Sequence, residues 1–234
     1  MTTTTITLPV KDANDMNAFV VTPDGSGPFP AVIVFQEAIG VNEHIRDVAG
    51  RVAALGYIAI APELFHRTAS PGFESGYNDF SLVMPHFQAI TVETLINDSR
   101  ACYDWLQAQD NVIGDKIGCI GFCLGGRAAF VANSALPLAV SVAYYGGGTH
   151  MVAHLAAKLH GPQMFFWGGK DTHILPEHVA TVVDAVNLAG KDYINVVISY
   201  APHAFYCDAR PAYHPEAARE AWGMTVAFLK NKLG

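Results

Sequence analysis

The chain has 234 residues, of which 51% are hydrophobic, and it carries a formal net charge of −7 at pH 7. A chain of this length and composition can bury one sizeable core, so we expect residues 1–234 to form one domain. Lys and Arg number 14 against 21 Asp and Glu. This balance argues against a nucleic-acid partner, because phosphate binding needs clustered positive charge.

The N-terminus and the cysteines indicate the compartment. Residues 1–10 have neither a basic head nor a long apolar run, so we expect no signal or transit peptide. No later stretch is long and apolar enough to span a bilayer, and we expect no membrane partner. The cysteines, Cys102, Cys119, Cys123 and Cys207, show no C-x-x-C spacing and favour free thiols. We therefore predict a cytoplasmic protein.

An antiparallel pair of strands opens the predicted structure. Residues 4–8 alternate as an edge strand does, and 18–22 read as its partner. The continuous apolar run 31–35 is typical of a strand covered on both faces. A helix with apolar residues at helical spacing follows and is stopped by Gly56. With the next buried strand, 57–61, it completes one βαβ unit.

The rest of the chain continues the alternation of strands and helices. Residues 62–91 lack periodicity, and a loop this long in a compact domain is usually functional. The elements expected after it are a helix at 92–107, a strand at 116–120, strands at 138–145 and 162–167, a helix at 176–190, a strand at 193–200 and a closing helix from 214. The pattern predicts an α/β fold class: a mainly parallel, doubly wound sheet with antiparallel N-terminal strands in a three-layer α/β/α arrangement.

Residues 121–125, Gly-Phe-Cys-Leu-Gly, read as a nucleophile elbow. A sharp strand-to-helix turn holds its middle residue in a strained conformation, so glycines are needed two residues away on either side. The side chain of Cys123 then stands above the sheet beside the backbone N–H of Leu124. The N-terminus of the following helix favours a thiolate there. Because Gly and Cys are also common in buried strands, the apolar strand before the elbow and the small-residue helix after it strengthen this interpretation.

Two further strand ends supply partners for a nucleophile. Asp171 lies four residues past the strand that ends at Trp167, and His203 follows the last strand. Nucleophile, acid and histidine in this chain order are typical of the α/β-hydrolase fold. Cys123 would attack, His203 would move the proton, and Asp171 would fix the imidazole tautomer. Taken singly, Asp171 could be a turn cap, His203 a solvated turn residue and Cys123 an inert core thiol.

With these motifs the chain resembles the dienelactone hydrolases (carboxymethylenebutenolidases) over nearly its whole length. The residues that carry the resemblance are Gln-Glu-Ala-Ile-Gly-Val-Asn at 36–42, the Gly-Phe-Cys-Leu-Gly-Gly elbow, Gly169-x-Asp171, and Pro-His-Ala-Phe at 202–205. The resemblance implies a Cys123–His203–Asp171 triad that acts on a small-molecule ester or lactone through a thioacyl intermediate, without a cofactor.

The resemblance also implies roles for residues near the triad. In the family, a carboxylate at the position of Glu37 contacts the resting thiol and takes its proton when substrate enters. The backbone N–H groups of Ala38 and Leu124 would form the oxyanion hole. Substrate-binding residues are expected at four positions, namely Ile39, Phe205, Tyr206 and Arg210.

Two departures from the family pattern concern the substrate. Members that hydrolyse the anionic dienelactone resemble each other in placing arginines before the central helix and three or four residues after the histidine. Here residues 68–99 contain no arginine, and Cys207 lies four residues past His203. Arg210 is a candidate replacement. The aromatic residues Phe80, Phe87, Phe205 and Tyr206 favour a more apolar pocket, so we expect a preference for neutral substrates.

Several alternatives remain open. Cys119 lies four residues before Cys123, so one alternative is a redox or peroxide-sensing thiol protein. In an extended strand the two thiols would be about 13 Å apart, which argues against a disulfide between them. A non-catalytic binding protein of the same fold is a further alternative. His150 and His154 have helix-like spacing but no third ligand, so we expect no metal. We expect a monomer or a homodimer.

Overall fold

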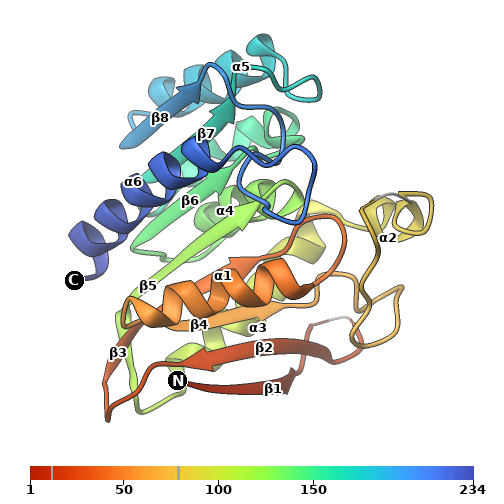
Figure 1. Cartoon of the computed structure of the whole chain (residues 1–234). Helices are drawn as coiled ribbons and strands as arrows, with labels where there is room; N and C mark the ends of the chain where they lie inside the picture. The colour runs from red at the N-terminus through yellow and green to blue at the C-terminus, as the bar shows by residue number, and fades with distance from the viewer. Residues whose placement is uncertain (12, 78–79) are drawn as a thin grey trace.

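The computed structural model describes residues 1–11, 13–77 and 80–234, and an eight-stranded sheet runs through them (Figure 1). The strands are β1 (Thr2–Leu8), β2 (Met16–Thr22), β3 (Phe29–Phe35), β4 (Ile58–Pro62), β5 (Val112–Phe122), β6 (Val140–Tyr144), β7 (Gln163–Gly168) and β8 (Tyr193–Ile198). Their order in the sheet is β1-β2-β4-β3-β5-β6-β7-β8. β2 is antiparallel to β1 and β4, and the other neighbours are parallel. The predicted mainly parallel sheet with antiparallel N-terminal strands is confirmed.

Helices cover both faces of this sheet. They are α1 (Glu43–Ala54), α2 (Met84–Gln88), α3 (Val92–Gln107), α4 (Leu124–Ala135), the 3₁₀ helix η1 (Thr149–Lys158), α5 (Pro176–Leu188) and α6 (Pro215–Leu233). In Figure 1, α1 and α6 lie on the near face of the sheet, and α3 and α4 lie behind it. Every residue of β4 and β6 is buried, as expected for parallel strands between two helical layers.

Two elements differ from the sequence-based expectations. The elbow strand begins earlier than predicted, because Val112 pairs with Phe29 of β3 ahead of an irregularity in the register. The helix η1 was not expected. Its buried residues are Thr149, Val152, Ala153, Leu155 and Ala156, so this segment packs an apolar side against the rest of the fold.

Several contacts tie the described residues of the long segment at 62–91 to the rest of the fold, and two of them position it at the loop after β3 and at α3. The buried carboxylate of Asp98, on α3, accepts hydrogen bonds from both terminal nitrogens of Arg67, at 2.8 and 2.9 Å. The backbone N–H of Ser75 donates to the carbonyl oxygen of Ile39 at 3.0 Å. The first contact holds the segment against α3 and the second holds it against the loop that follows β3, so its side chains can form a wall of a site there.

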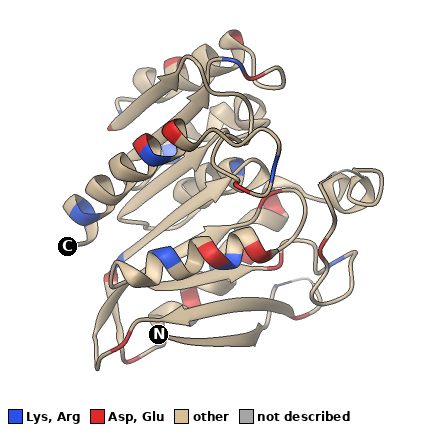
Figure 2. Cartoon of the chain, viewed as in Figure 1, with Lys and Arg blue, Asp and Glu red and all other residues tan. Residues whose placement is uncertain are grey.

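Charged residues of both signs are mixed on the molecule. Figure 2 shows Lys and Arg interspersed with Asp and Glu along α1 and α6. On α1, Nη2 of Arg51 lies 2.6 Å from Oδ2 of Asp47 one turn earlier. Within the ranges that the structure describes, no helix has the length and apolar character needed to cross a membrane.

Gly121→Ala is expected to destabilise the protein by more than about 3 kcal/mol. A Cβ at this position would overlap the carbonyl oxygen of Gly125 across the turn after β5. Gly50, in the middle of α1, is the matched control because nothing lies within 4 Å of its added Cβ. Gly50→Ala should stabilise by up to about 1 kcal/mol. Urea unfolding measures both free energies; equal values for the two variants would contradict this steric account of the turn.

Candidate active site

Cys123 occupies the turn between β5 and α4 in a backbone conformation that L-residues rarely adopt. Its φ is 55° and its ψ is −113°, and such a conformation costs about 1–3 kcal/mol unless its surroundings impose it. The Cys123 N–H donates to the carbonyl oxygen of Tyr144 on the neighbouring strand at 3.1 Å. A Cβ at Gly121 or Gly125 would collide with backbone atoms. The flanking glycines and the β6 contact therefore impose the turn that lifts the thiol above the sheet.

Asp171 and His203 follow β7 and β8 and complete a row of three side chains. Nδ1 of His203 lies 2.7 Å from Oδ2 of Asp171, and Nε2 of His203 lies 3.4 Å from Sγ of Cys123. The other carboxylate oxygen, Oδ1, accepts the backbone N–H groups of His173 and Ile174 at 2.7 and 3.0 Å. The carboxylate is thus held from two sides, and the imidazole bridges it to the thiol.

The three groups shift one another's protonation. Burial lowers the pKa of His203, but the hydrogen bonds to Asp171 and Cys123 and their charges outweigh it and raise the pKa to about 10. Burial raises the pKa of Asp171, but the hydrogen bond and charge of His203, together with two backbone N–H groups, give a net lowering. The arrangement therefore favours a protonated imidazole that stabilises negative charge on both of its partners.

Glu37 brings a second carboxylate to the site from the loop after β3. The residue is only 2% exposed. Its Oε1 accepts a hydrogen bond from the hydroxyl of Tyr145 at 3.4 Å, whereas its buried Oε2 has no hydrogen-bond partner within the described part of the chain. The hydrogen bond of Glu37 is thus with Tyr145, and the Cys123 thiol faces His203. Oε2 has the capacity to accept a proton or a donor that enters the site.

A cavity of about 410 Å³ lies against the thiol and the imidazole. It is lined by Glu37, Ala38, Ile39, Tyr77, Phe80, Phe87, Cys123, Gly147, His173, His203 and Arg210. The segment 62–91 supplies the aromatic wall. Ile39 and Arg210, two of the four residues expected from the sequence to bind substrate, line this cavity. A largely apolar cavity of this size suits a small organic molecule.

The two candidate oxyanion-hole residues lie close together. Ala38 lines the cavity, and its side chain belongs to a small apolar cluster that also contains Leu124. Leu124 is the first residue of α4, and the first N–H groups of a helix have no partner within it. The two residues that the resemblance assigns to the oxyanion hole are therefore neighbours, and Leu124 directly follows Cys123.

Phe205 and Tyr206, which the sequence placed at the substrate, lie in the core instead. The ring of Phe205 packs edge-on against Tyr145 at 5.2 Å, and that of Tyr206 stacks on Phe122 at 5.2 Å. Neither residue lines the cavity. The reason is the backbone at Ala204, whose φ of 59° turns the chain inward directly after His203.

The other thiols and histidines do not form a second reactive centre in the described residues. Cys119 is fully buried and donates to Oγ of Ser141 at 3.2 Å, and burial raises its pKa to about 12. All four cysteines are free. The ring of His150 stacks on His178 at 3.9 Å. Across the described ranges, no three His, Cys, Asp or Glu residues are grouped so as to hold a metal ion.

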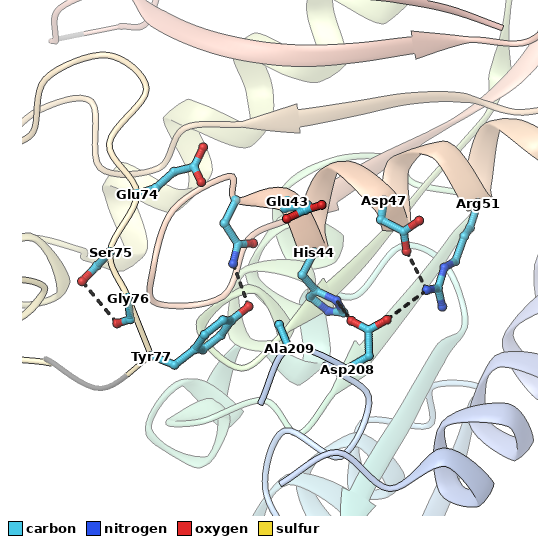
Figure 3. A pocket seen from close by; sticks show the side chains of 11 residues that line it. Glu43, His44, Asp47, Arg51, Glu74, Ser75, Gly76, Tyr77, Asp208 and Ala209 are labelled. Atoms are coloured by element: carbon cyan, nitrogen blue, oxygen red, sulfur yellow. Dashed lines mark hydrogen bonds and ion pairs between the residues drawn. The ribbon is translucent and has the colours of Figure 1, made fainter. Parts of the chain in front are cut away.

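A second cavity, of about 650 Å³, shares Tyr77 with the first (Figure 3). In it, Asp208 lies 3.5 Å from Nδ1 of His44 and 3.6 Å from Nη2 of Arg51. The amide of Asn42 donates to the hydroxyl of Tyr77 at 2.8 Å. None of the three residues in the Cys123 row lines this cavity. We interpret its polar contacts as a framework that fixes Tyr77 and the segment around Asp208.

The family model described as the dienelactone hydrolase family matches residues 16–233. The chain belongs to the dienelactone hydrolase family. A Yersinia pestis protein named "Putative carboxymethylenebutenolidase" is 36% identical over 221 residues, which cover 89% of this chain and 81% of that protein. The fold and these relatives make this dienelactone hydrolase family member a hydrolase of esters or lactones.

Two solved structures are similar over almost the full length of this dienelactone hydrolase family member. One, named "Putative Dienelactone Hydrolase", is from Klebsiella pneumoniae subsp. pneumoniae; it has a TM-score of 0.87 and 30% identity, covering 98% of this chain and 99% of that one. The other is P91, a dienelactone hydrolase-like promiscuous phosphotriesterase from metagenomic libraries, with a TM-score of 0.84 and 25% identity over 99% of each chain.

Three side chains near the site were not anticipated from the sequence. Tyr145 reads as the end of a buried strand, yet its φ is 36° and its ring lies 5.2 Å from that of His203. The hydroxyl of Tyr77, from the aperiodic segment, lies 3.2 Å from Sγ of Cys207. Of these three side chains, Arg127 could have been singled out from the sequence, because it is a charged residue in the otherwise uncharged helix α4.

Proposed function

We propose that this protein hydrolyses small esters or lactones through a Cys123–His203–Asp171 triad and a thioacyl intermediate. The observation that carries the proposal is the unbroken row of contacts from carboxylate to imidazole to thiol, 2.7 and 3.4 Å long, which ends at a cavity of about 410 Å³. A nucleophile, a base within hydrogen-bond reach and a group that orients the base are the requirements for covalent acyl transfer.

In the acylation step, Sγ of Cys123 attacks the carbonyl carbon as a thiolate, and the C=O electron pair moves onto oxygen. The backbone N–H groups of Leu124 and Ala38 hold the resulting oxyanion. Collapse re-forms the C=O bond and breaks the bond to the leaving oxygen. That oxygen takes a proton from the His203 imidazolium, and an alcohol departs. In a lactone the alcohol stays attached to the acyl group.

In the deacylation step, the neutral imidazole of His203 takes a proton from water as the water oxygen attacks the thioester carbon. A second oxyanion forms in the same place. Its collapse expels the thiolate of Cys123 and releases the carboxylic acid. The imidazolium and thiolate are then restored, while Asp171 keeps the ring oriented with Nδ1 toward its carboxylate throughout.

We propose that Glu37 serves as the proton acceptor for the Cys123 thiol, as the family resemblance implies. Its carboxylate lines the same cavity as the thiol, and its Oε2 is free of hydrogen-bond partners in the described residues. The hydrogen bond from Tyr145 to Oε1 would keep the free oxygen in place.

Glu37→Gln is expected to slow acylation by about 10- to 100-fold and to raise the pH optimum, because His203 alone must then generate the thiolate. Single-turnover kinetics with a p-nitrophenyl ester between pH 6 and pH 10 measure both effects. Glu43→Gln, at the exposed start of α1, is the matched control and should leave both unchanged. If the pH profile of Glu37→Gln is the same as that of the wild type, Glu37 does not accept the proton of Cys123.

The charge of the substrate is a separate question from the reaction. The expectation of neutral substrates depends on the absence of arginine from two sequence positions. Arg210 lines the cavity, and Arg127 lies over Phe87 in its wall. The neutral preference expected from the sequence stays a prediction, which the comparison of neutral esters with dienelactone tests.

A hydrolysis screen tests the proposed reaction. It compares p-nitrophenyl esters, dienelactone and a phosphotriester, each with the wild type and with Cys123→Ala. We expect turnover of at least one ester or lactone by the wild type and none by the variant. The phosphotriester arm is included because the similar P91 protein is described as a phosphotriesterase. Ester turnover that survives in Cys123→Ala would contradict the proposal.

A further inference from the structure

Tyr77 lies between the active-site cavity and the second cavity. Of the described residues, Tyr77 alone lines both of them. Residues 75–76, which precede it, line only the second cavity (Figure 3). A second segment divides in the same way, because Ala209 lines the second cavity and the next residue, Arg210, lines the first. We call Tyr77, Ala209 and Arg210 the partition between the two cavities.

The side chain of Tyr77 is held in place by three contacts. Its hydroxyl accepts a hydrogen bond from Nδ2 of Asn42 at 2.8 Å and lies 3.2 Å from Sγ of Cys207. Cζ of Arg210 lies over the ring, 5.5 Å from its centre. Because Oδ1 of Asn42 accepts the backbone N–H of Ile45 as the N-cap of α1, the amide nitrogen is left to face the tyrosine. The ring thus forms a fixed end to the active-site cavity.

The two cavities differ in chemical character. The cavity at Cys123 is largely apolar, with Phe80 and Phe87 in its lining. The described lining of the second cavity has more acidic than basic side chains, namely Glu43, Asp47, Glu74 and Asp208 against Arg51. Such a lining attracts cations and repels anions. A substrate group that crossed the partition would therefore pass from an apolar cavity into an acidic one.

We propose that Tyr77 is a specificity-determining residue, which closes the active-site cavity toward the second cavity and limits the enzyme to esters and lactones with short substituents on that side. The inference rests on the proposed hydrolysis at Cys123. A substituent that points toward Tyr77 must end at the ring. The carboxylates beyond the ring then do not reach the substrate, so a cationic group at the end of a long substituent gains nothing from them.

Opening the partition with Tyr77→Ala tests this role. The wild type and the variant are compared on the p-nitrophenyl esters of acetate, 7,7-dimethyloctanoate and 6-(trimethylammonio)hexanoate; the two long chains have the same shape and differ in charge. A second series has the same chains on the alcohol side, as acetates, with ethyl acetate as the short ester. In at least one series we expect kcat/KM for the cationic ester, relative to the short ester, to rise by at least about tenfold in Tyr77→Ala, and to rise less for the uncharged ester.

Further variants make the result specific. Tyr77→Phe keeps the ring and should show little of the gain, whereas Tyr77→Leu shortens the side chain and is the second opening variant if Tyr77→Ala does not fold. Phe87→Ala is the matched control, because it enlarges the active-site cavity at a residue that does not line the second cavity. There the cationic ester should gain no more than the uncharged one. Adding Glu43→Gln to Tyr77→Ala removes one carboxylate of the second cavity and should lower the gain of the cationic ester alone.

Unchanged ratios of long to short esters in the opening variants, in both series, would overturn the assignment, and so would an equal gain of the cationic ester in Phe87→Ala. Ligand binding separates this role from catalysis. The methyl ester of 6-(trimethylammonio)hexanoic acid is titrated calorimetrically into the Cys123→Ala protein with and without Tyr77→Ala. Tighter binding after Tyr77→Ala supports the partition whether or not the wild type hydrolyses these esters, and equal binding contradicts it.

Discussion

Cys123→Ala is expected to lower kcat for ester hydrolysis by about 10⁴-fold or more, since the variant has no group that can form the thioacyl bond. The fold should be unaffected, because the thiol is partly exposed at a cavity and an alanine has the same backbone requirements at this turn. Steady-state kinetics with a p-nitrophenyl ester measure the loss. If the wild type itself shows no ester turnover, the alternative of a non-catalytic binding protein is favoured.

Cys119→Ala is the matched control for the nucleophile. Its thiol is buried four residues earlier in β5 and donates to Ser141. After the substitution the Ser141 hydroxyl still donates to the carbonyl of Ala129 at 3.1 Å, so we expect a cost of only about 1 kcal/mol in stability and a nearly unchanged kcat. Equal losses of activity in the Cys119 and Cys123 variants would show that Cys123 is not the nucleophile.

Asp171→Asn is expected to lower kcat by roughly 10³- to 10⁴-fold while the fold is kept. Oδ1 of Asp171 already accepts two backbone N–H groups, so the amide oxygen of asparagine should take that place. The amide nitrogen then faces Nδ1 of His203 and donates to it, which forces the imidazole proton onto Nε2, toward the thiol. In that tautomer the ring cannot accept a proton from Cys123 or from water. Stopped-flow acylation kinetics measure the loss, and unchanged rates would mean that another group orients His203.

The same substitution should change how stability depends on pH. The folded-state pKa of His203 is raised to about 10 from its usual 6.5, so its stabilising effect is fully present below pH 6.5 and is lost as the pH rises through about 10. The pKa of Asp171 is lowered, so its contribution is lost as the pH falls through that value. The wild type should therefore exceed Asp171→Asn in unfolding free energy most at pH 5–6.5, with a smaller difference at pH 10. A constant difference would contradict the ion pair.

The fold class could be predicted because its signals are local. Buried apolar runs such as 31–35 and the helix at 92–107 are visible in the sequence, and their alternation implies a parallel sheet. The positions of Cys123, Asp171 and His203 after three strands also follow from topology, because the carboxyl ends of parallel strands meet at one edge of a sheet.

The rest of the site depends on tertiary structure. The inward turn at Ala204 removes Phe205 from the cavity, and sequence neighbours of His203 give no sign of it. Tyr77 reaches the cavity because a segment without periodicity is pinned by contacts far away in the chain, such as that of Ser75 with Ile39.

The most direct test of the account is to trap the covalent intermediate. The wild type is mixed with excess p-nitrophenyl acetate, quenched with acid during the first turnover, digested and mapped by mass spectrometry. We predict a single acetyl group on the peptide that contains Cys123, present at early times and absent after the substrate is exhausted. An acetyl group on a peptide that contains Cys207 or His203 but not Cys123, or turnover without any acetylated peptide, would contradict a thioacyl mechanism at Cys123.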